Sequence, residues 1–312
     1  MKILVAGGAG FIGSHVCQRL LIENHEVLCV DNLLTSSESN INEFKKNKNF
    51  RFIHADVIQP LILDKKVDAI FHLASPASPN HHSPISYHAL PMETMLVNTQ
   101  GTLNLLKLAS RDSAKFLFAS SSEIYGNPLV HPQTEEYLGN TSSIGPRSIY
   151  DEAKRFGETI TFHYFRQGLD VRVARIFNTY GPKMSKADMR MVVSFITQAK
   201  EGAPITVFGD GTQTRSLCYV LDTVEALMRL MFYENTKGAV INIGSQEEHT
   251  VLEYANIIKR LTGSKSEIVL SEKLPQDDPQ KRRPDLTLAK KLLDWEPKTS
   301  LEDGLKTMIE EL

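Results

Sequence analysis

Tyr150 and Lys154 stand four residues apart in the stretch YDEAK, inside a segment with a helical pattern. Side chains at this spacing lie on one face of a helix, so the lysine ammonium can stabilise a tyrosine phenolate. Such a phenolate can take a proton from an alcohol while hydride leaves to a nicotinamide cofactor. The pair therefore indicates oxidation of a hydroxyl group, although the same spacing arises by chance in many helices.

A second candidate cluster lies in FLFASSSEIYG, where three serines and Glu123 follow an apolar run. Hydroxyl groups at the end of a buried strand are common. A carboxylate directly after them is a candidate for contact with a substrate. An exposed loop charge or a helix cap is the alternative for Glu123.

The glycine-rich turn GGAGFIG follows the first expected strand directly and opens a helix. Gly7, Gly10 and Gly13 are three residues apart. Glycine permits a tight turn and the close approach of a pyrophosphate, and the helix N-terminus offers N–H groups to it. A glycine triplet alone is common in ordinary turns, but the sequence of strand, turn and helix predicts a dinucleotide site.

Asp31 ends the second expected strand, where an acid that binds a ribose is expected. Its carboxylate would repel a 2′-phosphate and no arginine follows in NLLTSSESN, so we expect NAD and not NADP. Asp56, after the third strand, is expected to contact the adenine, with an acidic loop cap as the alternative. The residues expected to bind the cofactor are Gly7, Gly10, Phe11, Ile12, Gly13, Asp31, Asn32, Asp56, Val57, Leu73, Ala74, Tyr150 and Lys154.

Short apolar strands alternate with helices over the first part of the chain, which predicts a parallel sheet covered on both faces. We therefore expect an α/β fold of the Rossmann type, with a doubly wound sheet. The expected strands are KILVAG, EVLCVD, FRFIHAD, DAIFHLA, KFLFAS and DVRVARI, and the helices lie near 11–23, 92–110 and 148–167.

After about residue 178 the loops lengthen and the pattern becomes mixed. We expect residues 1–177 to form the dinucleotide-binding domain, to which some later strands and helices return. Residues 178–312 are expected to form mainly a smaller substrate-binding region, with a cleft between the two. Helices are expected near 190–201, 220–234, 250–262 and 286–294, with the strand AVINIG among them.

The composition is that of an ordinary soluble globular protein, with 41% hydrophobic and 23% charged residues. A net charge of −2 gives no support for a nucleic-acid or membrane-surface partner. Cys17, Cys29 and Cys218 are widely spaced and odd in number, which suggests reduced thiols. The N-terminus enters a strand at once and no apolar run reaches transmembrane length, so we expect a cytoplasmic protein.

The motifs, in their order along the chain, resemble the extended short-chain dehydrogenase/reductase family and, within it, the UDP-glucuronate decarboxylases. They are GGAGFIG, HLAS, ASSSEIYG, YDEAK, RIFNTYGP, GDGTQTR, DDPQKRRPD and DWEPKTSLEDGL. The narrower resemblance rests on HLASPASP, GDGTQTRSLCYV and the stretch from Gln276 to Asp285. It covers nearly the whole chain, whereas GxxGxxG and YxxxK are shared by the entire superfamily.

The resemblance implies NAD-dependent conversion of UDP-glucuronate to UDP-xylose. In this reaction C4 of the sugar is oxidised, the resulting β-keto acid loses CO₂, and hydride returns to C4. Tyr150 would be the base, Ser121 would hold the same hydroxyl group, and Lys154 would hold the ribose and the phenolate. The implied catalytic residues are Ser121, Ser122, Glu123, Tyr150, Lys154 and Arg282.

The pair Ser122-Glu123 discriminates among the relatives. Sugar 4,6-dehydratases have Asp-Glu at these positions, and simple 4-epimerases usually have two small uncharged residues. Because a serine cannot readily protonate a leaving hydroxyl and decarboxylation needs no such acid, the pair favours a decarboxylase. A 4-epimerase or 4,6-dehydratase of another nucleotide sugar is the first alternative, and a non-catalytic dinucleotide-binding protein is the second.

Downstream basic and polar residues match the family's substrate contacts. Arg282 would lie beside the substrate carboxylate, with its neighbour Arg283 as a competing candidate and a solvated basic loop as the alternative. The guanidinium of Arg215 suits a diphosphate, and Asn178 either contacts the substrate or starts a turn. The expected substrate-binding residues are Asn178, Arg190, Arg215 and Arg282.

Three stretches depart from the family pattern. NHHSPISYHAL adds roughly five residues beside the expected sugar site, which makes the substrate identity less secure. TSSESN replaces a basic stretch after the ribose acid, which would weaken the affinity for the cofactor. Ser194 replaces an asparagine, so contacts to the nucleotide base would differ.

Two further expectations concern partners. His81, His82 and His88 lie in a loop of prolines and serines, and their spacing predicts no metal site. The family resemblance implies a homodimer in which the helices near 92–110 and 148–167 pair with their copies. The aromatic stretch ITFHYF is mild support for this contact, with aromatic core packing as the alternative.

Overall fold

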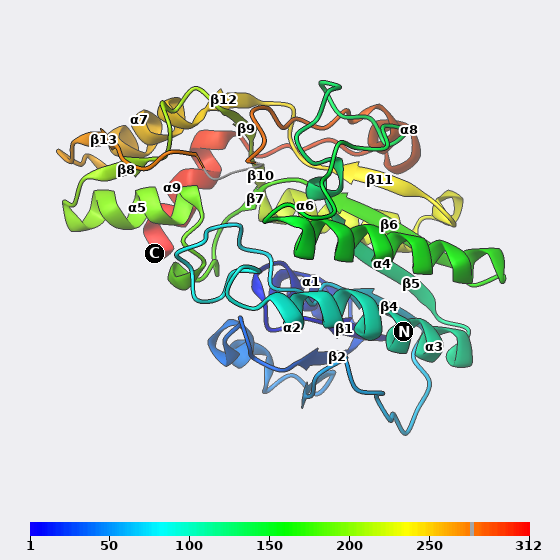
Figure 1. Cartoon of the computed structure of the whole chain (residues 1–312). Helices are drawn as coiled ribbons and strands as arrows, with labels where there is room; N and C mark the ends of the chain where they lie inside the picture. Colours follow the sequence, from blue (N-terminus) through cyan, green and yellow to red (C-terminus); the bar gives the residue numbers. More distant parts are fainter. Residues whose placement is uncertain (275–277) are drawn as a thin grey trace.

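The computed structural model describes residues 1–274 and 278–312. A seven-stranded sheet with the order β11-β6-β5-β4-β1-β2-β3 forms its centre (Figure 1). All six strand pairs in it are parallel, which confirms the expected Rossmann-type fold. The strands are β1 (Lys2–Ala6), β2 (Glu26–Asp31), β3 (Phe50–His54), β4 (Ala69–His72), β5 (Lys115–Ser121), β6 (Val171–Ile176) and β11 (Val240–Ile243).

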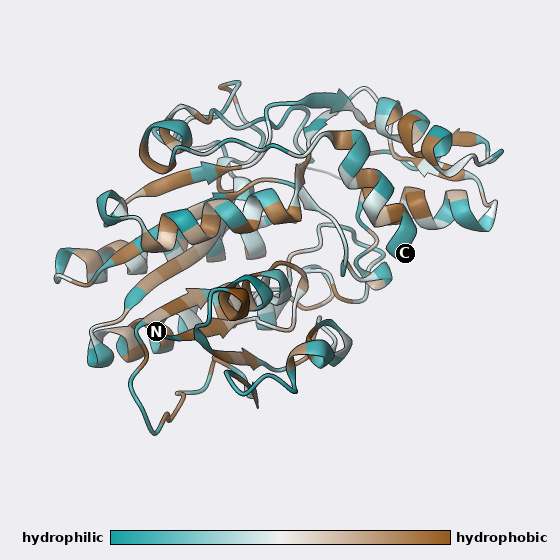
Figure 2. Cartoon of the chain, turned by 180° about the vertical axis from the view of Figure 1, so that it is seen from behind, coloured by the Kyte–Doolittle hydropathy of each residue, from teal (hydrophilic) through white to brown (hydrophobic). Residues whose placement is uncertain are grey.

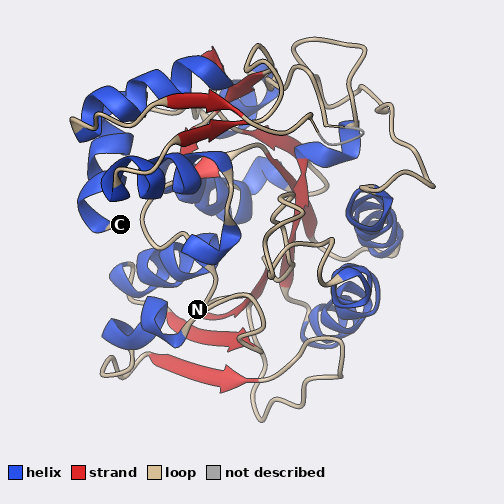
Figure 3. Cartoon of the chain, turned by 60° about the vertical axis from the view of Figure 1, so that its left-hand side comes forward, coloured by secondary structure: helices blue, strands red, loops and turns tan. Residues whose placement is uncertain are grey.

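Helices cover both faces of this sheet (Figure 3). One face carries α1 (Phe11–Ile22) and α6 (Val220–Phe232), and the other carries α3 (Thr102–Asp112) and α4 (Ser148–Arg166). The helix expected near 92–110 consists of α2 (Pro91–Leu96), a π-helical turn (Val97–Gly101) and α3. Among the described residues, no helix is both long enough and apolar enough to cross a membrane.

The core is split into two apolar layers by the sheet. Ile3 and Val5 of β1 pack into the layer under α1 and α6, whereas Leu4 and Ala6 pack into the layer under α3 and α4. Successive side chains of a strand point to opposite faces, so a strand buried on both sides must be apolar throughout. The strands are accordingly brown over most of their length in Figure 2.

The chain after residue 178 contributes to both parts of the molecule. Strand β11 joins the edge of the central sheet, α6 packs on α1, and α8 (Thr287–Leu293) packs against β11 and α6. The remaining elements gather beyond the carboxyl ends of the strands (Figure 1). The expected domain boundary between residues 177 and 178 stays a prediction. Helix α9 was not expected from the sequence. The elements beyond the carboxyl ends of the strands are β7 (Thr179–Tyr180), α5 (Met191–Glu201), β8 (Ile205–Val207), β9 (Thr214–Ser216), β10 (Cys218–Tyr219), β12 (Glu248–Thr250), α7 (Val251–Thr262), β13 (Ile268–Leu270) and α9 (Leu301–Glu311).

Candidate active site

The glycine turn between β1 and α1 has a backbone that only glycine can form. Gly7 has a φ of +77°, and a Cβ there would lie 2.6 Å from the backbone nitrogen of Ala74. A Cβ on Gly13 would lie 2.0 Å from the carbonyl oxygen of Gly7. Gly10 is the N-cap of α1, whose first N–H groups are available to an anion. The turn therefore fits a pyrophosphate.

Two cavities of about 440 and 230 Å³ meet at this turn. Gly7, Gly10 and Leu73 line both of them. All thirteen residues expected to hold the cofactor line one cavity or the other: Gly7, Gly10, Phe11, Ile12, Gly13, Leu73, Tyr150 and Lys154 line the larger, and Asp31, Asn32, Asp56, Val57 and Ala74 line the smaller. The residues present thus fit a dinucleotide that extends from Asp31 to Tyr150.

The two predicted nucleoside acids lie in the smaller cavity. Asp31 accepts hydrogen bonds from the backbone of Ala9 (3.0 Å) and from the Ser36 hydroxyl (2.7 Å), and Asp56 accepts one from Asn32 (2.8 Å). Ser36 belongs to TSSESN, so the stretch that departs from the family contacts the ribose acid directly. The carboxylate of Asp31 suits ribose hydroxyls as an acceptor and opposes a 2′-phosphate.

Helix α4 presents Tyr150 and Lys154 to the carboxyl end of β5, and both side chains are buried. Lys154 Nζ donates to the carbonyl oxygen of Ala119 (2.8 Å) and lies 5.6 Å from the centre of the Tyr150 ring. Burial raises the pKa of Tyr150 to about 12, against a hydrogen bond to Ser121 that lowers it. Burial also lowers the pKa of Lys154 to about 7. The predicted Ser-Tyr-Lys set is therefore assembled around one phenol.

Tyr87 is a site residue that the sequence reasoning missed. Its ring stacks on that of Tyr150, with centroids 4.9 Å apart and an interplanar angle of 20°. Its side chain is buried, and its hydroxyl has no hydrogen-bond partner within residues 1–274 and 278–312. Tyr87 belongs to NHHSPISYHAL, so the stretch that departs from the family fixes the ring of the expected base.

Glu123 lies between two buried guanidiniums. One carboxylate oxygen pairs with Arg147 and the other with Arg282. Burial alone would raise the pKa of Glu123, but the two arginines outweigh it and lower the pKa to about 2. The side chain is 13% exposed, so it is neither the solvated loop charge nor a simple helix cap. Glu123 is an anion that holds two arginines in place.

The structure shows that Arg282, and not its neighbour Arg283, is the arginine of KRR that lies in the site. Arg282 is 2% exposed, donates to the Ser122 hydroxyl (3.4 Å) and to the carbonyl oxygen of Gly126 (2.9 Å), and faces Glu123. Arg283 instead lies 3.6 Å from Glu248, away from this cluster. The Nε atom of Arg282 is buried and has no partner among the described residues. Arg282 is therefore a buried cation that is held beside Ser122 and Glu123.

A third cavity, of about 360 Å³, continues from the first toward the C-terminal elements. Glu123, Asn178 and Arg190 line both, and Arg215 and Arg282 line only the third cavity. All four expected substrate-binding residues are thus brought to one continuous space. Gln276 of the narrower family match lies outside the described residues.

Arg147 is the second functional residue that was missed. It pairs with Glu123 and with Asp278 (3.1 Å), which in turn binds Arg215 (2.6 Å). Burial alone would lower the pKa of Arg147, but the nearby carboxylates outweigh it and raise the pKa. An arginine that caps the N-terminus of a helix opposes the helix dipole. That anomaly in PRSIYDEAK was the sequence signal for a carboxylate partner.

Asp151 is the third missed residue. It follows Tyr150 in the first turn of α4 and is buried. Burial and the nearby Glu123 raise its pKa to about 8. Asp151 is therefore a buried acid that interacts electrostatically with Glu123 and directly follows the expected base.

Known proteins are similar to this chain in sequence and in fold. Residues 3–244 match the NAD dependent epimerase/dehydratase family. UDP-glucuronic acid decarboxylase 1 of Xenopus tropicalis is 48% identical over 99% of this chain and 71% of its own length. UDP-glucuronic acid decarboxylase 6 of Arabidopsis thaliana is 50% identical over the whole chain and 88% of its own length.

Solved structures agree with these relatives. UDP-glucose 4-epimerase of Thermotoga maritima, solved with UDP-glucose, is 32% identical with a TM-score of 0.88, covering all of this chain and 98% of that one. UDP-glucuronic acid 4-epimerase of Bacillus cereus, solved with UDP-glucuronic acid and NAD, is 28% identical with a TM-score of 0.86 and the same coverage. The resemblance to the extended short-chain dehydrogenases is confirmed, and the chain belongs to the NAD dependent epimerase/dehydratase family.

Proposed function

We propose that this protein is a UDP-glucuronate decarboxylase that converts UDP-glucuronate to UDP-xylose and CO₂ with NAD. The observation that carries the proposal is the pair of Arg282 and Glu123 beside Ser122, where a dehydratase would have an acid. Relatives named UDP-glucuronic acid decarboxylase, at 48–50% identity over nearly the whole chain, support the same substrate.

The cofactor cavity, which Tyr150 lines, shares Glu123, Asn178 and Arg190 with the substrate cavity. NAD bound there would accept and return the hydride of C4 and bring a positive charge near the phenol. Tyr150 takes the proton of the C4 hydroxyl, and Ser121 hydrogen-bonds the same oxygen. Because burial raises the pKa of Tyr150 to about 12, the nearby ammonium of Lys154 is needed to stabilise its phenolate.

The second half of the reaction needs a residue that binds the substrate carboxylate and does not need a residue that protonates a leaving hydroxyl. When C4 is a ketone, the bond from C5 to the carboxylate breaks, CO₂ leaves, and the electron pair enters the C4 enolate. Tyr150 and Ser121 donate to the enolate oxygen. Arg282, which lines the substrate cavity, orients the carboxylate. It afterwards holds the water that protonates C5, because a guanidinium is not itself deprotonated.

A 4-epimerase is the second candidate, since solved structures of UDP-sugar 4-epimerases have the same fold. Incubation of the protein with NAD and UDP-glucuronate, read by mass spectrometry, separates the two. Release of CO₂ with formation of UDP-xylose supports decarboxylation. Formation of a product of unchanged mass, or the absence of CO₂ release from NAD-loaded protein, would contradict the proposed decarboxylation.

We also propose a cytoplasmic homodimer. Met92 and Leu96 of α2 and Phe156 of α4 are exposed apolar side chains on the helices expected to pair with their copies. The three cysteines are buried free thiols, which suits a reducing compartment. Light scattering of the protein, with Phe156→Glu as the variant that should yield monomers, tests the dimer, and cell fractionation tests the compartment.

A further inference from the structure

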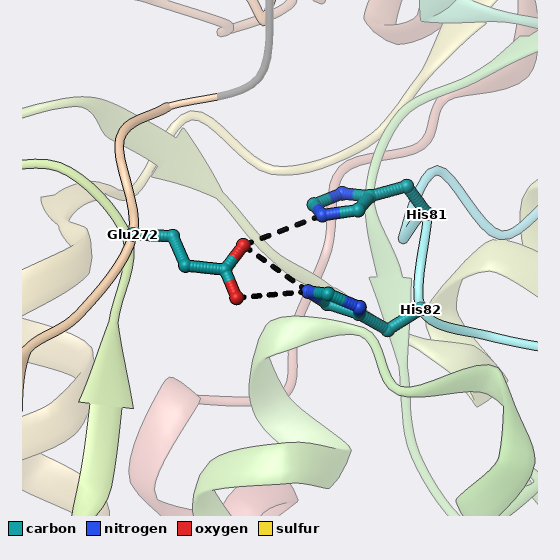
Figure 4. Close-up of side chains that lie close together, drawn as sticks. All are labelled: His81, His82 and Glu272. Atoms are coloured by element: carbon teal, nitrogen blue, oxygen red, sulfur yellow. Dashed lines mark hydrogen bonds and ion pairs between the residues drawn. The ribbon is translucent and has the colours of Figure 1, made fainter.

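Three exposed side chains from two distant segments converge at the outer rim of the substrate cavity (Figure 4). His81 and His82 come from the loop before α2, and Glu272 follows β13, 190 residues further along the chain. The Nε2 atom of His82 lies 3.0 Å from one carboxylate oxygen of Glu272, and that of His81 lies 3.4 Å from the other. Spacing in the sequence could not reveal this group, because its third member is so remote.

Hydrogen bonds to residues 187–189 fix the loop that carries the two imidazoles. The side chains of Ser78, Asn80 and Ser83 donate to the carbonyl oxygens of three consecutive residues, 188, 189 and 187, each at 2.6 Å. Asn80 also accepts the backbone N–H of His82 (2.9 Å). The histidine backbone is therefore held in one conformation while both rings face outward.

The segment that carries Glu272 is anchored independently. Strand β13 pairs with β8, and the backbone N–H of Ser271 donates to Val207 (2.9 Å). The carbonyl oxygen of Glu272 accepts the N–H of Gly209 (2.7 Å). The carboxylate thus meets the imidazoles because both backbones are fixed, and little backbone conformational entropy remains to be lost when a ligand binds.

We propose that His81, His82 and Glu272 bind a divalent transition-metal ion, with Zn²⁺ as the matching probe. Two imidazoles and a carboxylate form a donor set that Zn²⁺ prefers, and a fourth position would remain for water or another oxygen. Metal–ligand bonds of about 2.1 Å in a tetrahedron place ligand atoms roughly 3.4 Å apart. The observed separations of 3.0 and 3.4 Å are close to that value.

Such an ion would join two walls of the substrate cavity. His81, His82 and Glu272 line that cavity together with Phe208 and Arg215. The histidine loop continues to Tyr87, which stacks on the expected base. The metal would therefore cross-link the loop behind the catalytic ring to the strand at the far end of the cavity. The metal site is inferred from these contacts alone and does not depend on which reaction the protein catalyses.

Titration calorimetry of the chelator-treated full chain with ZnCl₂ tests the proposal. The expected result is one ion per chain, with affinity lowered more than about tenfold in His81→Ala/His82→Ala and in Glu272→Gln. His249→Ala is the matched control, because His249 pairs with Glu247 (2.9 Å) and the part of the chain that the structure describes offers this pair no third ligand. This variant should bind Zn²⁺ like the parent chain. Mg²⁺, which prefers oxygen ligands, should not compete.

Thermal unfolding provides a second readout that separates binding from folding. The melting temperature of the parent chain and of the control should rise with Zn²⁺, and those of the double variant and of Glu272→Gln should not. Absence of saturable Zn²⁺ binding in the parent chain would overturn the proposal. Equal affinity in the parent chain and in both ligand variants would overturn it as well.

Discussion

Replacement of Glu123 by glutamine removes the charge that two buried arginines share. The pKa of Glu123 is lowered from 4.5 to about 2, which corresponds to about 3 kcal/mol of stability at roughly 1.4 kcal/mol for each tenfold change. Loss of one member of a buried ion pair costs about 3–5 kcal/mol. We therefore expect Glu123→Gln to lower the free energy of unfolding at neutral pH by about 3 kcal/mol, measured by urea denaturation.

The pH dependence has a defined sign. Because the folded-state pKa is the lower one, the stabilisation from Glu123 is complete above pH 4.5 and is lost as the pH falls toward 2. The difference in stability between the parent chain and Glu123→Gln should shrink over this range. A difference that is constant with pH, or absent at pH 7, would contradict the ion-pair argument.

The same variant separates the two halves of the reaction. Arg147 retains Asp278 after the substitution, whereas Arg282 loses its carboxylate partner. A misplaced Arg282 should slow CO₂ release by about 100-fold, while formation of NADH from C4 oxidation changes far less. Rapid mixing with absorbance for NADH and trapping of CO₂ measures both rates. Equal loss of both rates would show that Glu123 is purely structural.

Glu248→Gln is the matched control for this experiment. Glu248 is 15% exposed and pairs with His131 (3.0 Å) and Arg283 (3.6 Å), close to the site but outside the cluster of Arg282. Its loss should lower stability without changing the ratio of CO₂ release to NADH formation. A changed ratio in this variant would mean that the ratio reports general loosening and not the position of Arg282.

Three further substitutions test other parts of the site. Tyr150→Phe should lower turnover by about 10²–10⁴-fold while bound NAD, measured in the purified protein, is unchanged; unchanged turnover would exclude Tyr150 as the base. Gly13→Ala should abolish NAD retention, because the new Cβ would lie 2.0 Å from the oxygen of Gly7, and normal retention would contradict the close approach in the turn. Tyr87→Phe should keep or raise the melting temperature, because it removes a buried hydroxyl without a partner among the described residues. A fall of the melting temperature by more than about 5 °C would correspond to a loss of stability well above about 1 kcal/mol in a chain of this size. Such a fall would show that the hydroxyl makes a hydrogen bond.

The parts of the fold that are governed by local chemistry were predictable. Apolar strands, a glycine turn and the YDEAK helix each carry their own signal, and the structure places them as expected. Helix α9 was missed although its local signals are present, since Ser300 is its N-cap and the buried Leu301, Leu305 and Met308 recur at helical spacing. Tyr87 was missed for a different reason, since stacking on Tyr150 depends on a loop conformation fixed by distant residues.

The ionic cluster shows why the role of Glu123 could not be derived from the sequence. Its type and place predict a charge near the substrate, but its protonation depends on the balance between burial and two arginines that lie 24 and 159 residues away. One arginine without the other would leave a buried carboxylate closer to neutrality, suited to proton transfer. With both in place, the carboxylate stays ionised and positions a guanidinium beside the expected sugar. The difference between a base and a positioning residue therefore lies in tertiary electrostatics, and it is set here by Arg147 and Arg282 together.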